Sequence, residues 1–349
     1  MGKNLDRYTI WKIGNEESNL KSILDLLGND YNQSIKYLEN SDVRDYEKTL
    51  NNKWINPDGS SELSIKEYEF KINSEKSNSK KVEYIYAKGL FETNLSEERA
   101  IVNGNILPRE SRIFNHSCEA CFIAINDAVY VVLKINSTDE SRVRNKLMKY
   151  HSDTSSKNLW GTIKYHKVPD YLIDSEFFYW LLHKKDKVDE IQLENEKMRV
   201  LDISQVFQED KYEIYTTHSM GEDILGSTSA LSAFGESQKI NKTGVIFVNE
   251  QIQIAGLVDT NSVFFIDIDQ SNINSNKNDF VSIAIYIYTY LLPQLFEAWS
   301  SEKKQSVWND ALLKEITKKW AINAILNLSK TNEISLNEIE DSMYLDEEL

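Results

Sequence analysis

The chain has 349 residues, with 40 lysines and arginines against 55 aspartates and glutamates, for a net charge of −15. Such a charge repels nucleic acid and anionic membranes in general, although a local basic surface can coexist with an acidic body. An apolar content of 41% with only 4 prolines and 12 glycines excludes a disordered or low-complexity chain. From the length we expect a sizeable core and about two domains.

The N-terminus carries no apolar segment after Lys3, and the whole chain has 2 cysteines. An export signal needs such a segment, and small secreted proteins usually rely on disulfides. We therefore expect a cytoplasmic protein.

Residues 1–75 are expected to form a helical N-terminal region. Leucine and isoleucine recur at helical spacing over 20–27, and Gly28 follows in the position that commonly ends a helix. Apolar residues over 31–38 predict a second helix. A stretch rich in Ser, Asn and Lys at 73–81 predicts a loop and marks the expected domain boundary.

Residues 76–215 are expected to form a mixed region. Two apolar arms between 122 and 135 flank Asn126-Asp127, which predicts a β-hairpin. The pattern then predicts a helix over 142–150, a strand over 162–168 and a helix over 177–183 capped by Asp174. Two short strands are expected at 198–203 and 212–215.

Residues 216–349 are expected to form an antiparallel meander followed by long helices. The strands are predicted at 245–248, 251–254 and 263–269, separated by turn residues. Apolar residues recur at helical spacing between Val307 and Ile325. Together the three regions predict an α+β fold.

The stretch 280–296 contains no charged residue and fits two structures. Alternating β-branched residues favour a strand, whereas its length favours a helix kinked or restarted at Pro293. We favour the helix. The run is shorter than the roughly 20 apolar residues that a membrane span needs and has no basic flanks, so a buried core helix is expected.

Three potential metal ligands, His116, Cys118 and Cys121, fall within six residues. A structural zinc site usually takes four ligands in two separated pairs, and this chain has no second cysteine pair. A redox Cys-x-x-Cys should open a helix, but a strand is predicted here. Two small apolar residues entering a core strand are the favoured interpretation, with metal or redox chemistry as the alternative.

Asp267 and Asp269 are expected on one face of a strand, two residues apart. Paired carboxylates at that spacing can hold Mg²⁺ for phosphoryl transfer or hydrolysis. The other interpretation is that the two acids mark the point where the strand leaves the core.

The segment from residue 142 to residue 168 is basic within an acidic chain. It contains seven lysines and arginines and one acid, Asp153, and aromatic residues and histidines are interleaved with them. Basic residues contact phosphates and aromatic residues stack on bases, so this composition suits an anionic partner. The candidate binding residues are Arg142, Arg144, Lys146, Lys149, Trp160, Lys164 and Lys167.

The chain ends on an acidic stretch: residues 333–349 carry seven acids and no lysine or arginine. Such a tail can mask a basic surface or pair with one on a second copy, so a homo-oligomer is one expected arrangement.

Two functions from different classes follow. The first is a cytoplasmic, non-enzymatic recognition or accessory protein that needs no cofactor and binds nucleic acid or an acidic protein through the basic segment. Its composition, rich in Asn, Lys and Ile, is typical of accessory proteins of low-GC bacteria and their mobile elements, including antiviral-defence factors. The alternative is a Mg²⁺-dependent nuclease or nucleotidyl-transfer enzyme that uses Asp267 and Asp269.

Overall fold

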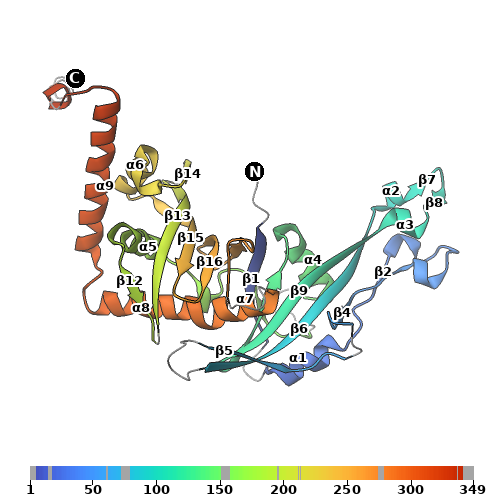
Figure 1. The fold of residues 1–349 in the computed structure, drawn as a ribbon. Coiled ribbons are helices and arrows are strands. Elements are labelled where there is room, and N and C mark those ends of the chain that lie inside the picture. The colour runs from blue at the N-terminus through green and yellow to red at the C-terminus, as the bar shows by residue number, and fades with distance from the viewer. Residues whose placement is uncertain are drawn as a thin grey trace. The chain divides into compact units, whose positions relative to one another are not determined.

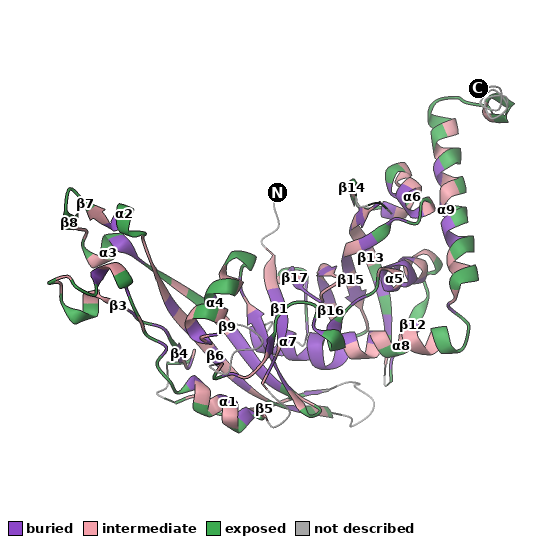
Figure 2. Cartoon of the chain, turned by 180° about the vertical axis from the view of Figure 1, so that it is seen from behind, coloured by how far each residue is buried: buried purple, intermediate pink, exposed green. Residues whose placement is uncertain are grey.

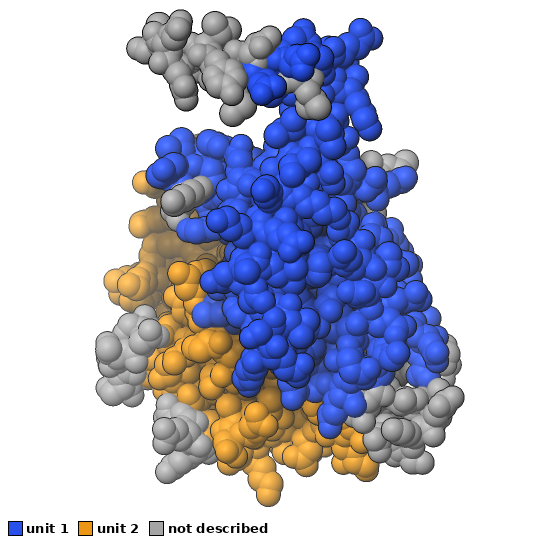
Figure 3. Space-filling model, turned by 90° about the vertical axis from the view of Figure 1, so that its left-hand side faces the viewer, with its two compact units in different colours: residues 1–5, 172–275, 291–349 blue, residues 6–171, 276–290 orange. Residues whose placement is uncertain are grey.

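A computed structural model gives the fold (Figure 1). It describes residues 5–14, 18–59, 62–71, 79–150, 158–194, 196–210, 212, 214–273, 279–335 and 337–340. The chain divides into two compact units: unit 1 contains residues 1–5, 172–275 and 291–349, and unit 2 contains residues 6–171 and 276–290 (Figure 3). Each unit combines antiparallel strands with α-helices, which confirms the α+β class.

Unit 2 is built on an antiparallel sheet. Its strands are β1 (Asp6–Ile13), β4 (Lys53–Ile55), β5 (Lys66–Lys71), β6 (Ser79–Asn94), β9 (Ile113–Ile125), β10 (Ala128–Lys134) and β11 (Ile163–Lys164). They run in the order β4-β6-β9-β10-β1, with β5 beside β6 and β11 beside β1. The predicted hairpin is confirmed: Ala128 pairs with Ile125, and Asn126 turns the chain with a φ of 53°.

Both faces of this sheet carry packed residues. Ile85 and Phe122 pair across β6 and β9 on the face that carries Trp54 and the helices α1 (Leu20–Leu27) and α4 (Glu140–Leu147). On the other face, α7 (Phe280–Tyr286) brings Phe280 to 5.9 Å from the Tyr86 ring. Figure 2 shows buried residues along β9 and α7.

Smaller elements complete unit 2 beyond the ends of the long strands. They are β2 (Gln33–Ser34), β3 (Thr49–Leu50), α2 (Glu97–Ala100), β7 (Ile101–Val102), β8 (Asn105–Ile106), α3 (Arg109–Arg112) and 3₁₀ turns at Lys36–Leu38, Asp45–Glu47, Ser137–Asp139 and Pro169–Tyr171. A separate apolar cluster of Ile35, Leu38, Leu50 and Ile113 packs beneath the elements between residues 33 and 50 and the start of β9.

Unit 1 contains the predicted meander, which the structure confirms as β15 (Lys239–Val248), β16 (Gln253–Asp259) and β17 (Phe264–Ile266). The sheet continues beyond β15 to β13 (Lys197–Glu209), and the other edge of β13 pairs with β12 (Glu190–Gln192) and β14 (Thr216–Met220). All of these pairs are antiparallel.

Four helices accompany the sheet of unit 1: α5 (Ser175–Lys187), α6 (Thr228–Gly235), α8 (Leu292–Lys304) and α9 (Asp310–Thr331). The predicted cap is present, because the Asp174 carboxylate accepts the Glu176 N–H at 2.8 Å. The Trp180 indole N–H donates to Glu302 on α8 at 2.8 Å, and Trp308 donates to Glu176 on α5 at 2.7 Å. A 3₁₀ turn at Ile224–Gly226 precedes α6.

Residues 280–296 are helical, as favoured from the sequence. After α7 the chain forms a π-helical turn at Ile287–Leu291, and Pro293 then lies in the first turn of α8, where its missing N–H costs no hydrogen bond. The helical stretch Phe280–Lys304 is long and apolar enough to cross a membrane, by length and composition. Within its most apolar window, 78% of residues are buried inside the protein, as in the core helix of a soluble protein.

The N-terminal region differs most from expectation. The predicted second helix over 31–38 is not formed, because the Tyr31 and Ile35 N–H groups bond to Asn52 and Lys48 instead of to a preceding turn. The strand β1 was missed because it is covered on both faces, so Tyr8, Thr9, Ile10 and Trp11 are all buried and the alternating pattern is absent. The expected boundary loop at 73–81 falls largely outside the described residues.

Another strand is expected at 212–215, but the described residues there, Tyr212, Ile214 and Tyr215, are not in a strand. The Asp210 carboxylate accepts the N–H groups of Tyr212, Ile214 and Tyr215 at 2.7 to 3.1 Å, which folds the chain back towards β14.

Candidate functional site

The basic segment, residues 142–168, lies in unit 2 and includes most of α4 together with β11. Lys164 of β11 pairs with Lys12 of β1. Residues 151–157, which include Asp153 and Lys157, lie outside the described residues. The structure therefore places two ends of the segment: the α4 half, residues 142–149, and the β11 half, residues 158–168.

Trp160 is a core residue and not a surface one. It is 1% exposed, and its ring centroid lies 5.9 Å from that of Phe122 and 6.3 Å from those of Tyr31 and Trp54. A buried indole cannot stack on a ligand base. This corrects the expectation that Trp160 contributes an accessible aromatic face.

Two arginines of the α4 half are paired with acids just outside the counted segment. The Arg142 guanidinium lies 2.5 Å from the Asp139 carboxylate, and the Arg144 guanidinium lies 3.9 Å from Glu140. Arg7 lies 2.5 Å from the other carboxylate oxygen of Glu140. The local excess of positive charge is therefore smaller than the count over 142–168 indicates.

Arg144 and Lys146 also stabilise the fold. The guanidinium carbon of Arg144 lies 3.5 Å from the centroid of the Tyr165 ring, a close cation–π contact. The Lys146 ammonium donates to the Gln33 amide oxygen at 2.8 Å. Both side chains are partly buried, and this burial lowers the pKa of each group. Lys149, half-buried, lies with its ammonium 5.6 Å from the centroid of the Tyr31 ring.

The β11 half is different. We call Lys164, Tyr165, His166 and Lys167 the lysine edge, because these four consecutive residues are exposed beside β1. Among the described residues, no carboxylate forms an ion pair with Lys164 or Lys167. Lys167 has a φ of 51°, so the chain turns sharply at this exposed lysine.

The nearby carboxylate of Asp170 is paired with groups outside the lysine edge. Its carboxylate accepts the Tyr130 O–H at 2.7 Å and the Lys12 ammonium at 2.9 Å. The Tyr130 hydroxyl and then Lys12 lower the pKa of Asp170, and Asp170 in turn raises the pKa of Lys12. Since Asp170 is paired with Lys12, the charge of the lysine edge remains available to a partner.

Asp267 and Asp269 do not lie on one strand face. The strand β17 ends at Ile266, and Asp269 lies exposed in the turn that follows. Asp267 is buried, and its carboxylate accepts the Gln270 N–H at 3.1 Å, which closes this turn. The two acids mark where the chain leaves the sheet, because one caps the turn and the other faces solvent.

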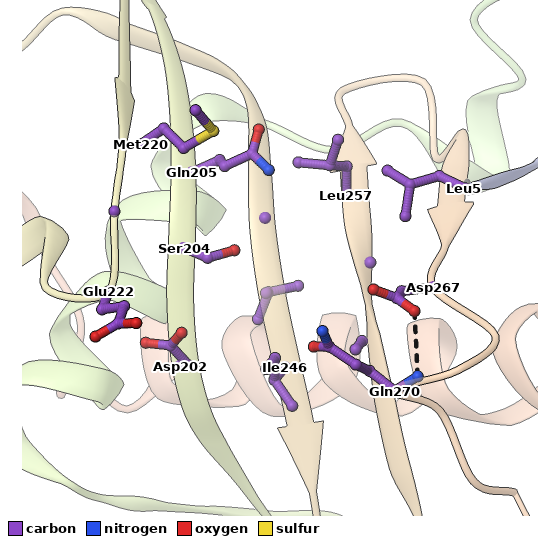
Figure 4. A pocket seen from close by; sticks show the side chains of 15 residues that line it. Leu5, Asp202, Ser204, Gln205, Met220, Glu222, Ile246, Leu257, Asp267 and Gln270 are labelled. Carbon is purple, nitrogen blue, oxygen red and sulfur yellow. Dashed lines mark hydrogen bonds between the residues drawn. The ribbon is translucent and has the colours of Figure 1, made fainter. Parts of the chain in front are cut away.

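Asp267 does line a pocket of about 280 Å³ on the sheet of unit 1 (Figure 4). Asp202 and Ser204 of β13 and Glu222 beyond β14 also line it, together with Gly244 and Gly256. The carboxylates are spread around the pocket: in the described part of the chain, no group of three or more His, Cys, Asp or Glu side chains could hold a metal ion.

Cys118 and Cys121 are free, buried thiols of β9. Burial raises the pKa of Cys118 to about 12 and raises that of Cys121 as well, so neither is a reactive thiolate at neutral pH. His116 stacks on Phe91 at 5.2 Å and shares a hydrogen bond with the Thr93 hydroxyl. These three residues pack as core and sheet residues, in line with the favoured interpretation.

The acidic terminal stretch is only partly described. Glu333, Glu338 and Glu340 are exposed, and residues 341–349 lie outside the described residues.

No family model matches this sequence, and no curated protein matches it.

Proposed function

We propose that this protein is a recognition or accessory protein that binds an anionic macromolecule through the lysine edge of unit 2. The observation that carries the proposal is the exposure of Lys164 and Lys167 without an ion-pair partner among the described residues. Exposed lysines supply the phosphate or carboxylate contacts that give such binding its affinity. Because the net charge of the chain is −15, a polyanion is repelled by most of the protein and is attracted locally by the lysine edge.

Aromatic residues support the same proposal. Tyr165 and His166 lie between the two lysines in the sequence, and Arg144 holds a further positive charge 3.5 Å from the Tyr165 ring centroid. An arginine remains protonated at neutral pH even when burial lowers its pKa. Cations interleaved with rings suit the backbone and bases of a single-stranded nucleic acid, and also an acidic protein surface.

The proposal is tested by replacing the two lysines together, Lys164→Glu and Lys167→Glu, and measuring retention on heparin and binding to oligonucleotides over a range of salt concentration. The matched control is Lys21→Glu with Lys36→Glu, because both lysines are exposed residues of unit 2 and the net charge changes equally. We expect the first variant to lose binding and the slope of log K against log salt to fall by roughly 1.5. Equal loss in both variants contradicts the proposal, since binding would then follow net charge alone.

The class of anionic partner follows from a second comparison. A single-stranded oligonucleotide offers bases to Tyr165 and His166, whereas polyglutamate offers charge alone. Tyr165→Leu should weaken oligonucleotide binding and leave polyglutamate binding unchanged if the partner is nucleic acid. An equal effect on both identifies an acidic protein surface as the partner.

A cytoplasmic location and a place in bacterial antiviral defence belong to the same proposal. Composition alone supports them. The enzyme alternative gains no support from the geometry, because Asp269 lies outside the pocket that Asp267 lines.

A further inference from the structure

The pocket on the sheet of unit 1 has a mixed lining (Figure 4). Its apolar part is formed by Leu5, Met220, Val245, Ile246, Ala255 and Leu257. The volume of about 280 Å³ lies at the lower end of the roughly 300–1,000 Å³ that is usual for small-molecule pockets. The pocket therefore has room for a small ligand, and its apolar part can cover a hydrocarbon portion of that ligand.

The ionisable residues that line the pocket are all acids: Asp202, Glu222 and Asp267. In Figure 4 the carboxylates of Asp202 and Glu222 point toward one another on one side of the pocket, and Asp267 lies on the other side. Within the described residues, neither the Asp202 nor the Glu222 carboxylate forms an ion pair or a hydrogen bond. Two carboxylates that face one another repel unless a cation lies between them.

Basic residues of the same strands do not neutralise these acids. Along β13 and β15, Arg199 and Lys242 are the basic residues closest in sequence to the pocket lining. The Lys242 ammonium lies 4.5 Å from the centroid of the Phe265 ring and 5.4 Å from that of the Phe207 ring. Arg199 is exposed and, like Lys242, does not line the pocket. The lining therefore contains three acids and no basic residue.

We infer that this pocket binds a small primary amine, with its ammonium between Asp202 and Glu222 and its apolar stem against Ile246 and Leu257. An ammonium has three N–H donors and no acceptor, and the two carboxylates and the Ser204 hydroxyl supply acceptors on that side of the pocket. Because no group of three or more potential ligands in the described residues could hold a metal ion, an organic cation suits the pocket better. The site lies in unit 1 and is independent of the lysine edge of unit 2.

The inference is tested by titrating the full chain with pentylamine and following methionine methyl signals by NMR. Met220 lines the pocket and is 71% exposed, whereas Met148 is buried in unit 2 and serves as the reference. Pentylamine should shift the Met220 signal, which Met220→Leu identifies, and leave that of Met148 unchanged. 1-Pentanol and pentanoate have the same stem without the positive charge, and they should bind roughly 10-fold more weakly or less. Equal binding of the three probes, or an unshifted Met220 signal, overturns the inference.

A charge-removing variant tests the position of the ammonium. Asp202→Asn with Glu222→Gln keeps the side-chain shapes, and it should weaken pentylamine binding by roughly 10-fold or more. Its urea midpoint should not fall, because the change removes a repulsion. The matched control is Asp189→Asn with Glu250→Gln, two exposed acids of unit 1 outside the pocket lining, and it should bind pentylamine as the parent does. Equal loss in both variants, or normal binding in the first, contradicts the assignment.

Discussion

The two halves of the basic segment carry similar residues and use them differently. In the α4 half, Arg142, Arg144 and Lys146 each contact a partner from the same unit, and burial lowers the pKa of two of them. In the β11 half, Lys164 and Lys167 are exposed and form no ion pair within the described residues. A run of positive charge in the sequence is therefore available to a partner only where the fold leaves the side chains exposed and without ion pairs.

The largest effect is expected for Trp160, which the sequence analysis placed among the candidate binding residues. Trp160→Ala should destabilise unit 2 by about 3–5 kcal/mol, because it removes a fully buried indole from between Phe122, Tyr31 and Trp54. Urea unfolding measures this loss. Trp160→Phe serves as the control, with a smaller loss and unchanged heparin retention. Weaker heparin retention in that folded variant would return Trp160 to the binding surface.

Smaller effects are expected for single alanine substitutions that compare the α4 half with the β11 half. Arg144→Ala should cost about 1–2 kcal/mol of unfolding free energy, since the Tyr165 ring loses its cation and the side chain loses its packing. Lys164→Ala should change stability by less than about 0.5 kcal/mol. Heparin retention should fall with Lys164→Ala. If Lys164→Ala is the more destabilising change, the division between a structural half and a binding half is wrong.

Lys167 has a positive φ, so replacing it with glycine should increase stability and weaken binding at the same time. Lys167→Gly should stabilise the protein by up to about 1 kcal/mol, because glycine adopts a φ of 51° without the strain that a Cβ introduces. The same change removes a charge and should weaken polyanion binding. Thermal unfolding and heparin retention on one sample measure both. A gain in stability with unchanged retention would show that Lys167 serves only the turn.

The smallest expected effect depends on pH. The lowered pKa of Asp170 means that its pairs with Tyr130 and Lys12 stabilise the fold above its ordinary value of 3.8, and this contribution is lost as the pH falls through the lowered pKa. Stability of the parent should therefore fall more steeply in this acid range than that of Asp170→Asn. Urea midpoints measured at neutral and acid pH give the difference. Identical pH profiles would contradict the pairing.

Much of the fold could be predicted because local signals agreed with tertiary packing. The hairpin at Asn126-Asp127, the cap at Asp174 and the meander after Lys239 all combine turn or cap chemistry with apolar periodicity. The strand β1 could not be predicted, because burial of both faces removes the alternation that identifies a strand. The turn after Asp210 was missed because its carboxylate bonds to three backbone N–H groups of apolar residues that otherwise resemble a strand.

The site was less predictable than the fold, for a physical reason. Whether Arg142 or Arg144 faces a partner depends on Asp139 and Glu140, which precede the segment, and on Tyr165, which lies far along it. Trp160 could not be assigned to the core from spacing, because its neighbours Tyr31, Trp54 and Phe122 come from distant parts of the chain. The exposure of Lys164, His166 and Lys167 is the part that the composition of the segment did indicate.

The position of the two cysteines has a practical consequence. Both thiols of this chain are in β9, at the centre of the sheet of unit 2, and unit 1 has none. A maleimide or disulfide reagent at neutral pH should therefore not react with the native protein. It should react with the two thiols only when unit 2 opens. The rate of thiol reaction therefore measures the opening of unit 2 without an introduced cysteine.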